Sequence, residues 1–263
     1  MLKKIKDNLY RIKQILLMDL KLHNLLRNAL TIAVGKNSNK LLFKNGVELY
    51  APKNLPLNEM VSEIFIQNIY TPTNFEIGPS DIIIDIGANI GIFSLFAAKK
   101  TCNLVYAFEP FIENIKYLMK NMQVNGVKNV LINKLAVSNK ISKKKLYLTK
   151  NPAGHILSYH NIKEEREYIE VPTTTLQSIL DNNNLEQVDF LKIDCEGCEG
   201  AIFMSTPKEY LRKIKKIAME FHDNVSPLKH YEIQGLLEEA GFVTKLNWNS
   251  ETPIGFLYAY NLR

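Results

Sequence analysis

Cysteine is scarce in this 263-residue chain, and long apolar runs are absent. Cys102, Cys195 and Cys198 make a poor disulfide framework and indicate a reducing compartment. Cys195 and Cys198 are spaced as Cys-x-x-Cys, but no further ligands accompany them, so we expect small packing residues. No run approaches the roughly 18 apolar residues of a membrane-spanning helix, and no signal-peptide pattern follows the charged start. These absences predict a cytoplasmic protein.

A strong excess of one charge is also lacking, since 33 Lys and Arg residues face 27 Asp and Glu residues. The formal net charge of +6 permits an anionic partner, but a solvated basic surface is the simpler explanation of so small an excess. Aromatic residues do not interleave with a basic stripe. We therefore expect no nucleic-acid partner.

Residues 1–75 are interpreted as an N-terminal accessory segment. A basic amphipathic helix is predicted over residues 1–33, because apolar residues recur at three- and four-residue steps between Lys and Arg, namely Ile5, Leu9, Ile12, Leu16 and Leu20. Such a helix can lie on an anionic membrane surface, or it can pack on its own domain or on a second copy in a homodimer. An Asn-Gly turn predicts a hairpin over residues 41–50, and another helix is expected over residues 58–69.

From residue 76 onward, short apolar runs alternate with helical patterns. Helices are expected at 90–99, 112–124 and 231–239, and strands at 82–84, 104–108, 130–135, 190–193, 217–221, 242–247 and 255–261. Continuous apolar strands between helices predict an α/β fold, a doubly wound and mostly parallel sheet that binds ligands beyond the carboxyl ends of its strands. Residues 138–175 interrupt this domain of residues 76–263 with an insertion, in which paired strands flank a polar loop.

A glycine turn follows the first strand of this domain. Asp85 ends the strand, and Gly87, Asn89 and Gly91 lead into the next helix. Glycine lets the chain turn tightly and lets a ligand approach the backbone, where free N–H groups at a helix start can meet a polar cofactor. Glu109 ends the next strand about 20 residues further on, the usual place for a carboxylate that binds ribose hydroxyls. This order of elements predicts a nucleotide-cofactor site.

The turn departs from two common nucleotide-binding patterns. The dinucleotide pattern Gly-x-Gly-x-x-Gly is absent, because Asn89 stands where the second glycine would be. Asp85 would place a carboxylate where a pyrophosphate passes, whereas it suits a ligand with an ammonium or hydroxyl group. The Gly-Lys-Ser/Thr sequence of a phosphate-binding loop is missing as well. A nicotinamide-dependent oxidoreductase of the same fold class is therefore disfavoured, but it stays an alternative.

Three motifs resemble those of the FkbM family of class I S-adenosylmethionine (SAM)-dependent methyltransferases. They are residues 81–94 (DIIIDIGANIGIFS), 108–110 (FEP) and 188–199 (VDFLKIDCEGCE), and the Asp-x-Glu-Gly-x-Glu sequence of the last is the most family-specific. The similarity runs from about Asn74 to Asn224. It implies a seven-stranded Rossmann-like sheet, SAM as the methyl donor, and O-methylation, often of sugar hydroxyls in glycans, glycolipids or glycosylated metabolites.

The resemblance also implies roles for individual residues. The SAM pocket would be lined by Asp85, Gly87, Ala88, Asn89, Gly91, Glu109, Pro110 and Ala136. Among these, Glu109 would hold the ribose and Ala136 would border the adenine. Asp194, Glu196 and Glu199 would mark the strand end that faces the methyl group. Glu196 and Glu199 are therefore candidate substrate contacts. His155 is a further candidate because it lies in the polar loop of the insertion, not because of the resemblance.

A hydroxyl group is a poor nucleophile at neutral pH, so such an enzyme needs a base or a metal ion beside it. Asp194, Glu220 and His222 are the candidate catalytic residues, because they stand at the ends of two late strands. A histidine is poised for proton transfer near neutral pH, although a structural role for His222 is equally open. The carboxylates could instead gather Mg²⁺, but helix capping and pairing with lysine are favoured, so no metal ligand is assigned.

Two hypotheses from different classes remain beside the oxidoreductase. The first is a SAM-dependent O-methyltransferase with a small-molecule or glycan substrate. The second is a non-catalytic module that binds SAM without transferring its methyl group. The set Asp194, Glu220 and His222 favours the enzyme, because a module that only binds SAM has no use for it.

Overall fold

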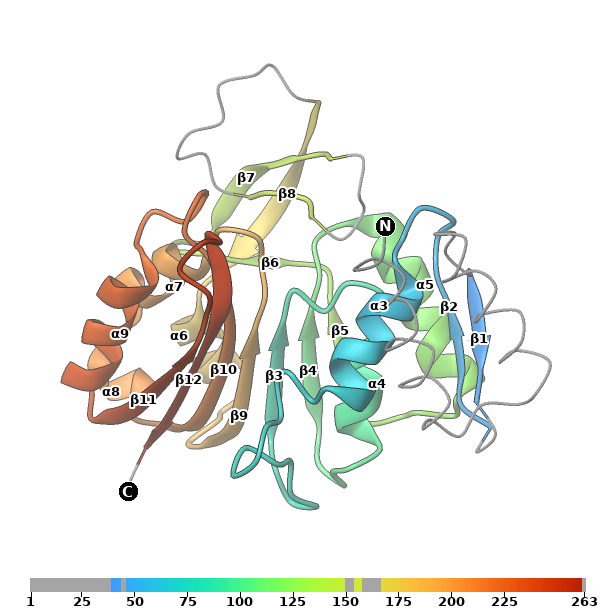
Figure 1. The fold of residues 1–263 in the computed structure, drawn as a ribbon, viewed down its shortest axis with the longest axis horizontal. Helices are drawn as coiled ribbons and strands as arrows, with labels where there is room; N and C mark the ends of the chain where they lie inside the picture. The colour runs from blue at the N-terminus through green and yellow to red at the C-terminus, as the bar shows by residue number, and fades with distance from the viewer. Residues whose placement is uncertain (1–38, 44–45, 150–153, 158–166, 262–263) are drawn as a thin grey trace.

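The structure, a computed structural model, describes residues 39–43, 46–149, 154–157 and 167–261. The strands of its central sheet are β3 Ile83–Ile86, β4 Val105–Phe108, β5 Val130–Asn133, β9 Val188–Ile193, β10 Ile214–His222, β11 Phe242–Asn247 and β12 Ile254–Asn261. They are ordered β11–β12–β10–β9–β3–β4–β5 (Figure 1). Strand β12 runs antiparallel to β10 and β11, and the other neighbours are parallel. The predicted doubly wound, mostly parallel sheet is confirmed.

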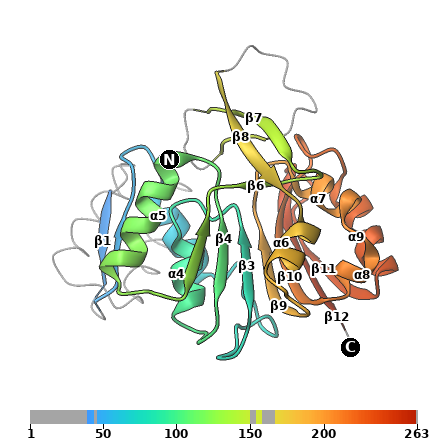
Figure 2. The same ribbon diagram turned by 180° about the vertical axis from the view of Figure 1, so that it is seen from behind.

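Helices cover both faces of this sheet. One set comprises α4 Ile92–Ala98 and α5 Ile112–Val124, and the other comprises α6 Leu176–Asn182, α7 Glu199–Ser205, α8 Lys208–Leu211 and α9 His230–Glu239. Successive residues of β3 serve the two layers, since Ile83 belongs to the apolar cluster with α4 and α5, and Ile84 to the cluster with α6, α7 and α9. In Figure 2, α6, α8 and α9 lie on the near side of the sheet. No helix in the described part of the chain has the length and apolarity needed to cross a membrane.

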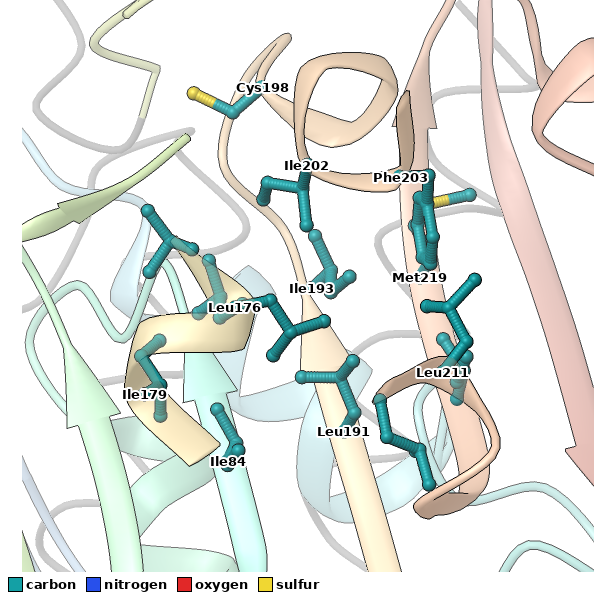
Figure 3. Packing of buried hydrophobic residues seen from close by; sticks show 14 of the residues in the cluster. Ile84, Leu176, Ile179, Leu191, Ile193, Cys198, Ile202, Phe203, Leu211 and Met219 are labelled. Atoms are coloured by element: carbon teal, nitrogen blue, oxygen red, sulfur yellow. The ribbon is translucent and has the colours of Figure 1, made fainter. Parts of the chain in front are cut away.

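Of helices α6, α7 and α8, the sequence suggests only the start of α7, where Glu196 and Glu199 were interpreted as helix-capping acids. The three helices contain seven, seven and four residues, too few to show a repeated helical period of apolar side chains. Their apolar residues nevertheless meet those of β9 and β10 in the second cluster (Figure 3). Cys198 is buried there and acts as the packing residue that was expected, whereas Cys195 is only partly buried.

The described part of the accessory segment shares the core of the main domain. Strands β1 Lys40–Leu42 and β2 Glu48–Tyr50 form the predicted hairpin, and α3 Leu57–Val61 continues into the π-helix η1 Ser62–Ile66 within the predicted helix. Asn121 of α5 ties the hairpin down, because its amide accepts from the Tyr50 N–H at 2.8 Å and donates to the Tyr50 carbonyl at 3.0 Å. The helix predicted over residues 1–33, with its membrane or dimer contact, lies outside the described residues.

The insertion forms a second, smaller sheet. Strands β6 Ala136–Val137, β7 Ser142–Tyr147 and β8 Tyr168–Thr174 are ordered β6–β8–β7, and β7 and β8 are antiparallel, which confirms the predicted strand pair. Figure 1 shows this sheet beyond the carboxyl ends of the parallel strands. Ile156 returns to β7 through a bridge with Tyr147. The insertion therefore lies where a doubly wound sheet binds its ligands.

Candidate active site

Two adjoining pockets lie at the carboxyl end of the sheet, between β3 and its neighbours β4 and β9. We call them the Glu109 pocket and the Tyr70 pocket after one lining residue of each. The space between protein atoms in them, part of it open to solvent, is about 540 Å³ and 770 Å³, respectively. Both are lined by Gly87, Asn89, Asp194 and Glu196, so these residues mark the junction of the two pockets. The junction coincides with the reversal of strand order at β3, the expected ligand position in such sheets.

The two glycines of the turn are required by packing. Gly87 has φ +75°, and a Cβ there would lie 1.7 Å from the carbonyl oxygen of Asp194. Gly91 has φ +83°, and a Cβ there would lie 2.9 Å from Cγ of Leu118 in α5. The sequence predicted that the glycines make room for a ligand, and Gly87 does border both pockets. The atoms closest to the missing Cβ groups nevertheless belong to Asp194, directly after β9, and to α5. Gly91 is not among the described residues that line either pocket, whereas Ala88 lines the Tyr70 pocket.

Asp85 is buried beneath the turn. Its Oδ1 lies 3.1 Å from Nζ of Lys192, and its Oδ2 accepts a hydrogen bond from the Ser94 hydroxyl at 2.6 Å. Lys192 also donates to the Gly87 carbonyl at 2.8 Å, so this buried pair ties β3, the turn and β9 together. Asp85 is not among the described residues that line either pocket. The geometry therefore gives Asp85 a structural role, and its contact with a ligand ammonium group stays a prediction.

Glu109 occupies the position expected for a ribose-binding acid. Its carboxylate accepts hydrogen bonds from the N–H groups of Asn89 at 2.9 Å and Phe111 at 2.8 Å, and it borders the Glu109 pocket with Pro110 and Ala136. Burial raises the pKa of Glu109 to about 7, against the effect of these hydrogen bonds. The group therefore changes its charge near neutral pH, where its ability to accept a ligand hydroxyl changes too.

Tyr70 joins two of the predicted catalytic carboxylates. Its hydroxyl lies 2.9 Å from Oδ2 of Asp194 and 3.0 Å from Oε2 of Glu220. The Tyr70 hydroxyl has a single proton and donates it to only one of the two carboxylates at a time. A second proton, bound to one of the carboxyl groups, would relieve the repulsion between them. Accordingly, burial and the charge of Asp194 raise the pKa of Glu220 to about 8. No motif surrounds Tyr70 in the sequence, so only the fold reveals its place.

His222 lies behind Glu196. Its Nδ1 is 3.0 Å from Oε1 of Glu199 and its Nε2 is 3.4 Å from Oε2 of Glu196. Burial opposes the charged ring, but the two carboxylates outweigh it and raise the pKa of His222 to about 10. The ring is therefore an imidazolium at neutral pH, which favours the structural role over the role of base, the two roles that the sequence left open. Neither His222 nor Glu199 is among the described residues that line the pockets, so the expected substrate contact of Glu199 is not supported.

Glu196 stands between the pockets in an unusual backbone conformation. Its φ of +52° is rare for a residue with a side chain, and such outliers occur most often at functional sites. Burial raises the pKa of Glu196 to about 7, although His222 opposes the shift. The side chain thus combines a position at the junction with a proton affinity near neutrality.

A metal ion could bind to part of this cluster. Ligand atoms of Asp194, Glu196 and His222 lie within 4.8 Å of one another. This set differs from the all-carboxylate set that the sequence suggested for Mg²⁺. The imidazolium of His222 and the ammonium of Lys192 already face these carboxylates, so their charge does not require a cation.

The topology of the central sheet defines the class of the protein. The last strand, β12, lies antiparallel between β10 and β11, which is the Rossmann-like arrangement of class I methyltransferases. The family follows from the sequence of this region: residues 85–244 match the Methyltransferase FkbM domain, so the chain belongs to the FkbM family of SAM-dependent methyltransferases. This membership removes the oxidoreductase alternative.

Individual relatives are distant. Methyltransferase 1 of Beauveria bassiana is 26% identical over 200 residues, which cover 68% of this chain and 78% of the relative. The 31-O-demethyl-FK506 methyltransferase FkbM of Streptomyces tacrolimicus is 25% identical over 211 residues, covering 68% and 79% of the two chains. The crystal structure of a methyltransferase FkbM from Methylobacillus flagellatus superposes with a TM-score of 0.48 at 14% identity and covers 70% of this chain and 44% of its own.

Proposed function

We propose that this methyltransferase acts on a hydroxyl group of a carbohydrate-like acceptor, such as a glycan, a glycolipid or a glycosylated metabolite. The observation that carries the proposal is the polar part of the wall of the Tyr70 pocket, in which five carboxyl side chains outnumber one ammonium group, namely Glu59, Glu63, Asp194, Glu196 and Glu220 against Lys192, with Tyr70 beside them. The ammonium of Lys192 is already paired with buried Asp85. Carboxylates accept hydrogen bonds from hydroxyl groups and repel phosphates, so a neutral, hydroxyl-rich acceptor suits this wall. A relative whose name specifies an O-demethyl substrate supports oxygen as the methylated atom.

The Glu109 pocket suits the adenosyl part of SAM. Glu109 offers a carboxylate to ribose hydroxyls, and Ala136 and Val137 supply apolar surface for a flat base. SAM, when bound, supplies a methyl group activated by its sulfonium charge. Asp194 and Glu196 at the junction would attract that positive charge and hold it beside the Tyr70 pocket.

Glu196 is the proposed acceptor of the hydroxyl proton. It lines both pockets, and its raised pKa of about 7 suits a general base that works near neutral pH. His222 acts as a positioning residue, because it contacts Glu196 from behind and is anchored by Glu199. Asp194 and Glu220, bridged by Tyr70, would bind the acceptor. The role of base thus moves from His222 to Glu196.

Transfer of a labelled methyl group tests this proposal. The protein is incubated with methyl-deuterated SAM and fractionated cell extracts, and the label is located by mass spectrometry. We expect label in the glycan or glycolipid fraction and none with heat-denatured protein. Label confined to nucleic acid or protein would contradict the acceptor class. Binding of S-adenosylhomocysteine (SAH) without transfer to any fraction would favour the non-catalytic module.

A further inference from the structure

His155 lines the Glu109 pocket and has one buried ring nitrogen without a hydrogen-bond partner among the described residues. It lies in residues 154–157 of the insertion, where Ile156 exchanges backbone hydrogen bonds of 2.8 and 3.1 Å with Tyr147 of β7. The His155 ring packs edge to face on Phe111, with the ring centroids 4.3 Å apart. Phe111 follows the ribose-site acid by two residues and donates its N–H to Glu109. The ring of His155 is therefore held beside the segment that carries Glu109.

The hydrogen bonds of His155 fix which ring nitrogen carries the proton. The N–H of Thr149 donates to Nδ1 at 3.1 Å, so Nδ1 is unprotonated. Burial lowers the pKa of His155, so the ring is neutral at physiological pH and its proton is on Nε2. Nε2 is buried, and no hydrogen-bond partner for it exists among the residues that the structure describes.

A buried N–H group without an acceptor is unfavourable, and native structures rarely retain one. His155 borders the same pocket as Glu109, Pro110 and Ala136, and it is not among the described residues of the Tyr70 pocket. Ligand atoms in the Glu109 pocket are therefore the available partners. The adenine ring nitrogens and ribose oxygens are hydrogen-bond acceptors of the required kind.

We propose that His155 is a cofactor-binding residue, whose Nε2–H donates a hydrogen bond to the adenosyl group of SAM. The inference rests on the proposed use of the Glu109 pocket for that group, and it reassigns His155 from the substrate to the cofactor. The insertion then contributes to cofactor affinity. The tautomer makes the site selective for ligands, because only a ligand with a hydrogen-bond acceptor next to Nε2 can accept the Nε2 proton.

The test compares two ligands by calorimetry, SAH and 5′-methylthioadenosine, which keeps the adenosyl group and lacks the amino-acid part. His155→Phe retains a ring against Phe111 but removes the donor. We expect this variant to bind both ligands about tenfold more weakly, which corresponds to the loss of roughly one hydrogen bond. His155→Gln, which keeps an N–H donor, should recover part of the affinity. The thermal unfolding midpoints of both variants are measured to check that they are folded. If His155→Phe does not fold, His155→Gln is compared with the wild-type protein alone.

The other outcomes are distinguishable. Unchanged affinity for both ligands, with a raised KM for the acceptor, would return His155 to the substrate and overturn the inference. Weakened binding of SAH alone would place the contact on the amino-acid part and overturn it as well. Failure of the wild-type protein to bind either ligand would contradict the assignment of the Glu109 pocket in the proposed function, and this inference with it.

Discussion

The Nδ1 atom of His222 lies 3.0 Å from Oε1 of Glu199, and both side chains are almost fully buried. Glu199 opens α7 and also accepts the Gly197 N–H at 3.1 Å, so the ring of His222 is fixed by two elements. The opposite ring nitrogen faces Glu196. His222 therefore links Glu199, a residue of the Asp-x-Glu-Gly-x-Glu motif, to Glu196, which borders both pockets.

This pair predicts how stability depends on pH. The folded-state pKa of His222 is raised from 6.5 to about 10. The stabilisation of the folded state by charged His222 is therefore complete below pH 6.5 and is lost progressively as the pH rises to about 10. His222→Gln removes the titrating ring and should cost about 3 kcal/mol at neutral pH. Urea unfolding of both proteins across this range should show their difference shrinking as the pH rises. A constant difference would contradict a charged His222.

The buried pair of Asp85 and Lys192 predicts strong coupling between two substitutions. Lys192→Met leaves the Asp85 carboxylate without its cation, and Asp85→Asn removes the nearest anion of the ammonium and leaves only the more distant Asp194, so each should cost about 3–5 kcal/mol. The double variant should cost clearly less than the sum, because neither charge remains. Denaturant unfolding of the four proteins measures the coupling. Additive effects would show that the pair contributes no mutual stabilisation.

Gly87 and Gly126 form a matched pair of positions with positive φ. An alanine at Gly126 meets nothing within 4 Å and should cost about 1–2 kcal/mol from backbone strain alone. An alanine at Gly87 meets the Asp194 carbonyl in addition and should destabilise the protein much more, because β9 must move. Thermal unfolding of Gly87→Ala and Gly126→Ala checks the difference. Equal losses would mean that the turn relaxes around the new methyl group.

Glu109 predicts a pH-dependent affinity for the cofactor product. Its pKa is about 7, and ribose hydroxyls donate best to the ionised carboxylate, so SAH should bind more tightly as the pH rises through 7. Below this pH the affinity should fall by at most about tenfold per pH unit. Calorimetry one pH unit on either side of 7 measures the change in SAH affinity. Glu109→Gln should bind SAH more weakly than the wild-type protein, with an affinity that does not depend on pH. A flat profile for the wild-type protein would contradict the assignment.

The main domain was predictable because its strands are continuous apolar runs separated by clear helices. Ile112–Val124, for example, forms a helix at the predicted bounds. The short helices α6 and α8 were missed and α7 was indicated only by the acids at its start, because the apolar residues of these helices are too few to establish a period. The accessory hairpin was predictable from its Asn-Gly turn, but its attachment to Asn121 depends on residues about 70 positions apart.

The site was predictable only where one motif determined it. Glu109 and Asp194 follow strands directly, so their place at the carboxyl end of the sheet follows from the sequence. The orientation of Asp85 does not, because it depends on a lysine more than 100 residues away. The charge of His222 and the contacts of Tyr70 arise from elements that meet only in the folded chain.

Glu196→Gln tests the proposed mechanism most directly. The measurement is the rate of methyl transfer to the carbohydrate fraction that the wild-type protein labels, over a range of pH, with SAH affinity determined in parallel. We predict a fall in kcat of at least about 100-fold, loss of the inflection near pH 7, and little change in SAH affinity. Full activity of Glu196→Gln with an unchanged pH profile would contradict the account.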